Sequence, residues 1–190
     1  MAFYVLAFFM GLFVLVSNFL VQFPINYFGM NEILTYGALS YPITFLITDL
    51  ANRRYGKIVA RDIVYFGFIL GIVLTLFFST NFSELISIRI AIGSGMAFLV
   101  AQLLDVNIFN ILRKKIWFVA PFTSSLIGSL VDTLLFFSIA FYGTGLNWLT
   151  LAFGDFTVKL FLALIMLIPF RLLMLKLKDV SEYSVKASSV

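Results

Sequence analysis

Residues 3–23, FYVLAFFMGLFVLVSNFLVQF, decide the fold class because they form a long apolar run without a single charge. A helix of about 20 apolar residues crosses the roughly 30 Å hydrocarbon core of a bilayer. No residue from Met1 to Asn31 is charged, and the run lacks the basic start and the small-residue cleavage site of a secretory signal. We therefore predict a retained transmembrane helix here.

The remainder of the chain has the same apolar character. Of its 190 residues, 62% are hydrophobic and only 12% are charged. Continuous apolar runs replace the alternating pattern of a transmembrane barrel and predict helices instead. The predicted fold is an all-α membrane protein, a single six-helix transmembrane domain over residues 1–178 with a short cytoplasmic tail at 179–190. The six predicted spans are residues 3–23, 33–52, 63–82, 89–112, 120–142 and 153–175.

The basic residues predict the orientation of the helices. All Lys and Arg residues except Arg89 and Lys159 follow the second span, follow the fourth span or lie in the C-terminal region. Loops rich in Lys and Arg stay on the cytoplasmic side of a membrane. Both termini are therefore predicted to be cytoplasmic. This distribution accounts for the net charge of +4 without a nucleic-acid partner.

Several classes of chemistry are disfavoured by residues that the chain lacks. It contains no Cys and no His, which removes thiolate chemistry, His-containing metal sites and imidazole proton relays. It carries no phosphate-binding loop, zinc signature or Gly-x-Ser-x-Gly motif. We therefore expect no enzyme, catalytic residue, metal or cofactor, and we place the function among polar groups inside the membrane.

Three predicted helices carry polar side chains at a spacing of three or four residues, which puts each set on one helix face. A carboxylate at the centre of a membrane helix costs about 2.5–3.5 kcal/mol, so these faces should turn inward. The sixth span adds Asp155 and Lys159 one helical turn apart. The three sets are Tyr41, Phe45, Asp49 and Asn52 or Arg53; Phe98, Gln102, Asp105 and Phe109; and Ser125, Gly128, Ser129 and Asp132.

The depth of each aspartate ranks the candidates. Asp132 lies nearest the centre of its span, where an idle charge is hardest to explain, so we predict a functional role for it. Asp49 lies near the cytoplasmic end of its span and could instead be an interfacial partner of Arg53. Asp105 could instead be a buried hydrogen-bond hub.

Two cations and one amide complete the candidates toward the opposite side of the membrane. Lys159 could extend outward to the membrane surface, pair with Asp155 or bind a ligand. Arg89 is predicted to anchor a helix end. Asn18, in the first span, is a candidate polar contact.

Other features predict where helices bend, pack and repeat. Tyr41-Pro42 interrupts the second span and should break or kink it. Gly93 and Gly95 are suited to close helix approach. The stretches TFLITDL at 44–50 and SLVDTLL at 129–135 set hydroxyls beside an aspartate in oppositely directed spans. An inverted repeat would place a site between those spans.

Several motifs, in order along most of the chain, resemble the queuosine precursor transporters of the vitamin uptake transporter family. That family is distantly similar to the six-helix substrate-binding subunits of energy-coupling-factor importers. The Asp155–Lys159 segment continues the match. The motifs are SNFLVQFP at 17–24, YPITFLITDL at 41–50, YGKIVARD at 55–62, AQLLDVNIFNILR at 101–113 and WFVAPFTSSLIGSLVDTLLFFSIAF at 117–141.

The resemblance implies import of 7-deazaguanine bases, such as 7-cyano- or 7-aminomethyl-7-deazaguanine, for salvage into modified tRNA. It implies a multi-pass protein of the bacterial cytoplasmic (inner) membrane. Many members have Glu where this chain has Arg53, so an Asp49–Arg53 pair would not be general to the family. The family positions matched here are Asn18, Asp49, Asp105, Asp132 and Lys159, with Arg61 at the start of the third span.

The chemistry of such a base agrees with these residue types. Its ring N–H and exocyclic amine lie side by side, so one carboxylate can accept both hydrogens. Tyr41 and Phe45 are expected to stack on the ring, and Gln102 and Asn107 to complete its polar edge. Asp132 is predicted either to contact the ligand directly or to act as the proton-coupling carboxylate, with Asp49 and Asp105 from facing helices closing the inner side of the same cavity.

Other classes remain open at this point. The chain could be a substrate-binding subunit of an energy-coupling-factor importer, which would need an ATPase and a coupling partner. Small-residue coupling motifs in the first span would favour that class, yet residues 3–23 offer few small residues. An intramembrane enzyme is disfavoured by the missing His and Cys. Besides the small-molecule substrate and the lipid bilayer, a homo-oligomer remains open.

Overall fold

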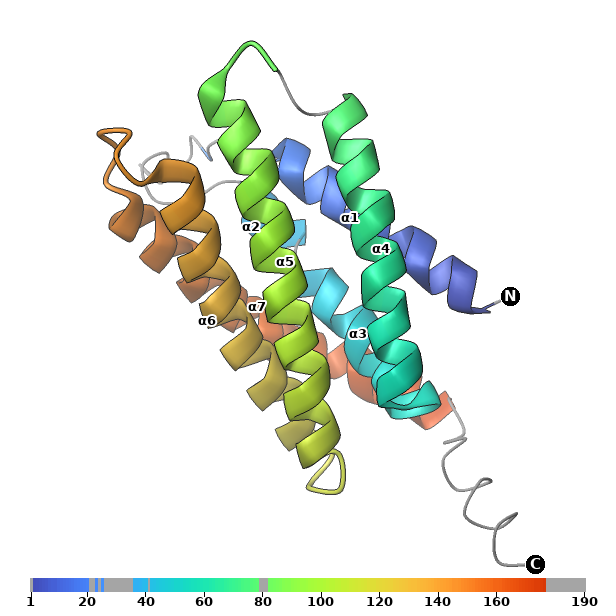
Figure 1. Cartoon of the computed structure of the whole chain (residues 1–190). Coiled ribbons are helices and arrows are strands. Elements are labelled where there is room, and N and C mark those ends of the chain that lie inside the picture. The colour runs from blue at the N-terminus through green and yellow to red at the C-terminus, as the bar shows by residue number, and fades with distance from the viewer. Residues whose placement is uncertain are drawn as a thin grey trace, which may run out of the picture.

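The computed structural model describes residues 2–20, 23, 25, 36–40, 42–78 and 82–176, and every regular element in these residues is a helix. The all-α prediction is therefore confirmed for this part of the chain. The predicted tail at 179–190 lies outside the described residues. The elements are α1 (Ala2–Leu20), α2 (Gly37–Ser40), α3 (Pro42–Tyr55), α4 (Lys57–Phe78), α5 (Leu85–Leu112), α6 (Val119–Phe141) and α7 (Trp148–Lys176) (Figure 1).

Within the second predicted span the structure describes two helices, α2 and α3, on either side of Tyr41; because Tyr41 lies outside the described residues, the break or kink predicted there stays a prediction. α2 ends at Ser40 and α3 begins at Pro42, where a proline costs no helical hydrogen bond. The short α3 contacts all the other helices, so it lies at the centre of the bundle. Its polar side chains, including Thr44, Thr48 and Asp49, are buried there.

The turn between α3 and α4 is shorter than predicted. Gly56 alone separates the two helices, and its φ of +86° is the left-handed conformation that glycine adopts most readily. Lys57 and Arg61 are therefore helical, and α4 begins before the predicted start of the third span at residue 63. The prediction of a loop up to residue 62 was wrong because one left-handed residue suffices to reverse the chain.

Small residues allow α1 to pack closely along α4. A side chain at Gly67 would collide with Met10, and one at Gly71 would collide with Val14. Met10 and Val14 belong to the largest core cluster, which also includes Phe45 of α3 and residues of α4 and α5. A second cluster joins α5 to α6 and α7 around Phe136. α5 therefore lies between two halves of the core.

Large apolar side chains cover the outside of the helices. Phe77 is 81% exposed and Phe153 is 74% exposed. Four helices, α4 to α7, are long and apolar enough to cross a membrane, while α1 is apolar but shorter. An apolar surface this extensive suits lipid rather than water. The protein is a multi-pass membrane protein.

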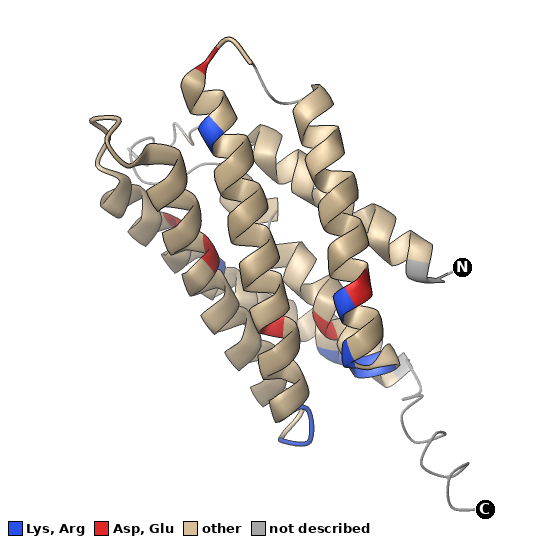
Figure 2. Cartoon of the chain, viewed as in Figure 1, with Lys and Arg blue, Asp and Glu red and all other residues tan. Residues whose placement is uncertain are grey.

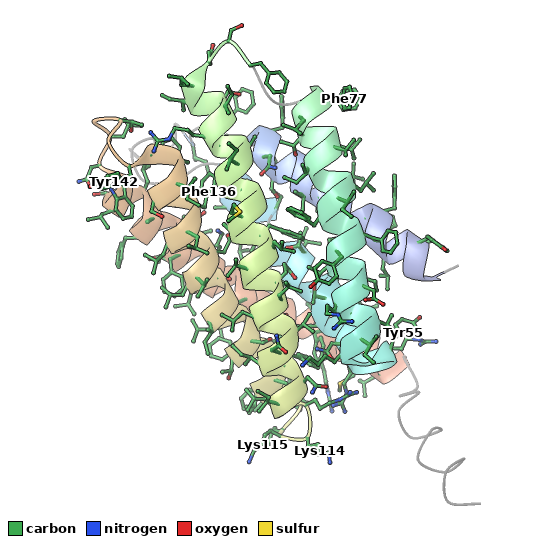
Figure 3. All side chains as sticks on the ribbon, viewed as in Figure 1. Tyr55, Phe77, Lys114, Lys115, Phe136 and Tyr142 are labelled. Carbon is green, nitrogen blue, oxygen red and sulfur yellow. The ribbon has the colours of Figure 1, made fainter. Side chains whose placement is uncertain are left out.

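Charged side chains are concentrated at one end of the bundle (Figure 2). We call this the basic end; it contains Arg53, Arg54 and Lys57 at the α3–α4 turn and Lys114 and Lys115 in the α5–α6 loop. Figure 3 shows Lys114 and Lys115 at this end, with Phe77 and Tyr142 toward the opposite end.

Candidate functional site

A buried ion cluster joins α6 to α7. Lys159 Nζ lies 2.8 Å from Asp132 Oδ2 and 2.6 Å from Asp155 Oδ2. Thr133 Oγ1 donates to Asp155 Oδ2 over 2.8 Å and accepts from Lys159 Nζ at 3.3 Å. These side chains are all nearly inaccessible to solvent. With every group ionised, two carboxylates face one ammonium, so the cluster carries an excess negative charge.

This cluster lines a small cavity of about 30 Å³, which we call the Lys159 cavity and which must widen to admit a ligand larger than water. Five helices contribute to it, and its wall combines charged groups, hydroxyls, an amide and the Phe136 ring. An apolar ring beside convergent polar groups is typical of sites for small planar ligands. The lining residues are Ser17, Asn18, Gly37, Ala38, Ser94, Asp132, Phe136, Asp155 and Lys159.

Asn18 is held in the wall of this cavity by hydrogen bonds from both sides. Its Nδ2 donates to Thr75 Oγ1 on α4 over 2.9 Å, and Ser94 Oγ on α5 donates to its Oδ1. Ser17 Oγ and Ser40 Oγ share a hydrogen bond of 2.8 Å nearby. Contacts with α4 and α5 therefore fix the orientation of the Asn18 amide of α1.

Asp49 and Asp105 form a second buried group near the basic end. Ser124 Oγ and Ser125 Oγ of α6 lie 3.3 and 3.4 Å from the two Asp49 carboxyl oxygens and donate to them. The Asp105 carboxyl lies beside that of Asp49 and interacts with it. Neither Asp105 oxygen has a donor in hydrogen-bond geometry among the described residues.

Asp49 lines a second small cavity of about 10 Å³, which we call the Asp49 cavity. Its other walls are mostly apolar, and Phe45 packs on Gly128 so closely that an added Cβ there would lie 2.7 Å from the ring. Asp105 is not among the lining residues. The lining residues are Pro42, Phe45, Leu46, Asp49, Pro121, Ser125, Ser129, Ala163, Met166, Leu167 and Phe170.

Successive turns of the same helices line both cavities. On α7, Lys159 lines the first cavity and Ala163, one turn later, lines the second. On α6, Asp132 lines the first cavity and Ser129 lines the second. The two cavities therefore follow one another along the α6–α7 seam toward the basic end. Asp132 and Asp49 line different cavities, so the expectation of one shared cavity for Asp132, Asp49 and Asp105 was wrong.

The Gln102 amide forms hydrogen bonds between two helices. Gln102 Nε2 donates to Thr44 Oγ1 over 2.9 Å, and Gln102 Oε1 accepts from Thr48 Oγ1 over 2.6 Å. Both bonds join α5 to α3, and Gln102 lines neither cavity. Asn107 is exposed and donates to the Leu103 carbonyl of its own helix. Neither position supports the expected contact with a base edge.

The remaining predicted residues divide between the two cavities. Asn18, Asp132 and Lys159 line the first, and Phe45 and Asp49 line the second. The predicted stacking partner Tyr41 lies outside the described residues. The buried faces predicted for α3 and α6 are thus confirmed. The division of their residues between two cavities was not predicted.

The alternative interpretations of the charged residues are also resolved. Asp49 contacts Ser124 and Ser125 of α6, while Arg53 donates to the Arg113 carbonyl, so these two residues do not form the considered pair. Lys159 is 4% exposed and does not extend outward.

Two further interpretations concern Asp105 and Arg89. Asp105 has no hydrogen-bonding donor among the described residues, so it is not a hub. Arg89 donates to the carbonyls of Ile139 and Tyr142 at 3.0 and 2.7 Å, which confirms it as an anchor of the α6 end.

Ser94, Phe136 and Ser124 were missed as site residues. Ser94 lies between Gly93 and Gly95, and this stretch of sequence was interpreted only as a site of close helix packing. A hydroxyl flanked by two glycines on a buried helix was the available signal for Ser94. Nothing in the sequence distinguishes Phe136 from the many other phenylalanines of this chain.

The described residues offer no group of three or more Asp, Glu, His or Cys side chains that could hold a metal ion. The polar groups of the two cavities are suited instead to hydrogen bonding and proton binding. The Lys159 cavity presents both an ammonium donor and carboxylate acceptors. It can therefore read a ligand edge that carries adjacent donors and acceptors.

The chain is similar to known proteins along most of its length. A family model described as "Putative vitamin uptake transporter" matches residues 35–174, which include most residues of both cavities. A Haemophilus influenzae protein named "Probable queuosine precursor transporter" is 36% identical over 195 aligned positions, covering 86% of this chain and 82% of that protein. The Escherichia coli K12 protein named "Queuosine precursor transporter" is 33% identical over 197 positions, covering 91% and 88%.

A more distant relative comes from Bacillus subtilis and carries the same name as the Haemophilus influenzae protein. It is 28% identical over 187 positions, covering 83% of this chain and 81% of the relative. No solved structure gives a significant match. The family match and the two nearer relatives together span nearly the whole chain. The chain therefore belongs to the vitamin uptake transporter family.

Proposed function

We propose that this protein imports queuosine precursors, 7-deazaguanine bases, across the bacterial cytoplasmic membrane for tRNA modification salvage. The relatives named queuosine precursor transporters support the substrate class. The observation that carries the proposal is the buried Asp132–Lys159–Asp155 cluster in the wall of the Lys159 cavity. A buried ion cluster beside a cavity in a membrane protein calls for a functional role.

The cluster complements the edge of a 7-deazaguanine base. That edge carries a carbonyl oxygen, a ring N–H and an exocyclic amine in a row. The Asp132 carboxylate would accept from the two nitrogen donors, and the Lys159 ammonium would donate to the carbonyl oxygen. Their 2.8 Å separation sets an acceptor and a donor side by side, as that edge requires. The Phe136 ring would cover the flat face of the base.

Asn18 and Ser94 are assigned to the opposite wall of the same site. Their mutual hydrogen bond and the bond from Asn18 to Thr75 fix the amide before a ligand arrives. A polar group that is already oriented loses less entropy on binding. We assign these two residues to the remaining polar atoms of the base.

The proposed topology has six membrane crossings, with α2 and α3 together forming the second, and both termini in the cytoplasm. The concentration of Lys and Arg at the basic end supports this orientation, because such residues are retained on the cytoplasmic side. The Lys159 cavity would then lie on the extracytoplasmic side of the Asp49 cavity. A substrate entering at Lys159 would leave past Asp49.

Uptake into lipid vesicles that contain only this protein tests the proposal. We expect entry of labelled 7-cyano-7-deazaguanine at a rate well above that of protein-free vesicles, with competition by unlabelled precursor. A substrate-binding subunit of an energy-coupling-factor importer would bind the base without moving it, because its ATPase would be missing. Binding without uptake would therefore favour that alternative, and the absence of both would contradict the proposal.

A further inference from the structure

The buried charges of the described helices do not balance. The charged side chains in their interior are Asp49, Asp105, Asp132, Asp155 and Lys159. Lys159 forms salt bridges with Asp132 and Asp155. Asp49 and Asp105 are left as a separate pair of carboxyl groups, 2% and 0% exposed.

No Lys or Arg of the described residues interacts with this pair. The groups that act on Asp49 are Asp105, Ser124 and Ser125, and those that act on Asp105 are Asp49 and Ser124. The neighbouring charges on α3, α4, α5 and α7 are engaged elsewhere. Arg53 and Arg113 each donate to the other's backbone carbonyl, Arg54 lies over the Tyr55 ring, Arg61 pairs with Asp62, and Arg171 lies over the Trp117 ring.

Hydrogen bonding shows the same imbalance. The Ser124 and Ser125 hydroxyls donate to Asp49, whereas neither Asp105 oxygen has a donor in hydrogen-bond geometry within the part of the chain that the structure describes. Two ionised carboxylates side by side and away from water repel each other strongly. A proton on one carboxyl removes the repulsion and supplies the donor that Asp105 lacks.

We propose that the Asp49–Asp105 pair holds one proton and that this proton moves inward with each substrate molecule. The proposal rests on the proposed function, since it supplies the driving force for uptake through the Lys159 cavity. The proton binds between the two carboxyl groups and leaves through Asp49, which lines the cavity toward the basic end. Deep burial keeps Asp105 away from that cavity, so it acts as the acceptor that retains the proton.

α6 is one of the helices that connect the two sites. α6 supplies Asp132 to the Lys159 cavity and supplies Ser124 and Ser125 to Asp49. A shift of α6 on substrate binding would change the hydroxyl groups that solvate the Asp49 carboxylate. Losing those donors favours the protonated form, and regaining them favours release. Coupling thus requires only a small movement of one helix.

Uptake under imposed ion gradients tests the coupling. Vesicles with the full chain would be given an interior about one pH unit more alkaline than the outside, in sodium-free buffer. For one proton per uncharged 7-cyano-7-deazaguanine, the base should accumulate up to about tenfold. Asp105→Asn and Asp49→Asn should equilibrate the base without accumulating it, whereas Glu84→Gln, at an exposed acid before α5, should accumulate it like the wild type.

Three outcomes would overturn the coupling. The first is wild-type uptake that ignores the pH gradient, and the second is accumulation driven by a sodium gradient in its place. The third is full accumulation by Asp105→Asn. Absence of any binding or uptake by the wild type would instead contradict the proposed function, which separates the two failures.

Infrared spectroscopy of the purified chain tests proton binding without transport and without reliance on a variant. A protonated carboxyl absorbs above the amide bands, and the wild type should show this absorption at neutral pH. Asp105→Asn should remove it, because the remaining Asp49 carboxylate accepts from Ser124 and Ser125, and Glu84→Gln should leave it. A wild-type spectrum without the absorption, or a band that persists in Asp105→Asn, would overturn the proposal.

Discussion

Lys159 on α7 lies 2.8 Å from Asp132 on α6, and both side chains are buried near the middle of the bundle. The bond joins two helices that are also linked by the hydrogen bond from Thr133 to Asp155. It also fixes a donor beside an acceptor on the wall of the Lys159 cavity. The same contact therefore contributes to both the stability of the fold and the recognition of a ligand.

Removing the ammonium should destabilise the protein. Lys159→Met would leave the Asp132 and Asp155 carboxylates facing each other, and a buried charge that loses its partner costs about 3–5 kcal/mol. Thermal unfolding of the purified protein in detergent measures the effect, with Lys115→Met in the exposed α5–α6 loop as the control. Equal melting temperatures for the two variants would show that the cluster contributes little to stability.

A methyl group at Gly128 should disturb the packing of Phe45. The added Cβ would lie 2.7 Å from the ring, so the ring must move into the Asp49 cavity. Such overpacking costs about 1–3 kcal/mol. Gly128→Ala should therefore unfold at a lower temperature and transport more slowly.

A second substitution supplies the control for that effect. Phe45→Leu shortens the side chain that the new methyl group meets, so the double variant should recover part of the lost stability. Additive losses in the two single variants would indicate that Gly128 and Phe45 do not act on each other.

The exocyclic amine of the base should determine selectivity. A 7-deazahypoxanthine analogue lacks this amine and would leave part of the Asp132 carboxylate without a donor. An unsatisfied buried group costs about 1–3 kcal/mol, so the analogue should bind at least about tenfold more weakly. Competition against a labelled precursor measures the ratio. Equal competition by the two compounds would exclude a carboxylate as the reader.

The orientation can be tested because the chain contains no cysteine. Cysteine introduced at Asn147, in the exposed α6–α7 loop, should react with an impermeant thiol reagent applied to intact cells. Cysteine at Lys114, in the exposed loop at the basic end, should react only after the cells are opened. The opposite pattern of labelling would reverse the proposed topology.

Helix identity and inward faces could be predicted from the sequence because apolar length and spacing determine them locally. The α6 face from Ser125 to Asp132 is buried as expected. The faces of α3 and α5 were predicted equally well. Each of these features depends on residues close together in the chain.

Contacts between distant helices were beyond such reasoning. The partners of Lys159 depend on how α6 rotates against α7, and the spacing of Asp155 revealed only one of them. Gln102 resembled a ligand contact, yet Thr44 and Thr48 occupy both ends of its amide. Polar spacing indicates which side chains face inward but not which of them satisfy one another.

The affinity of Asp132→Asn for a 7-deazaguanine precursor tests the central claim most directly. The amide exchanges one acceptor oxygen for a donor, and Lys159 keeps Asp155 at 2.6 Å, so the fold should persist. We expect calorimetry to show at least about tenfold weaker binding by a protein that is still folded, with a melting temperature lowered less than in Lys159→Met and with normal binding by Glu84→Gln. A folded Asp132→Asn protein with wild-type affinity and wild-type uptake would contradict the assignment of the Lys159 cavity as the substrate site.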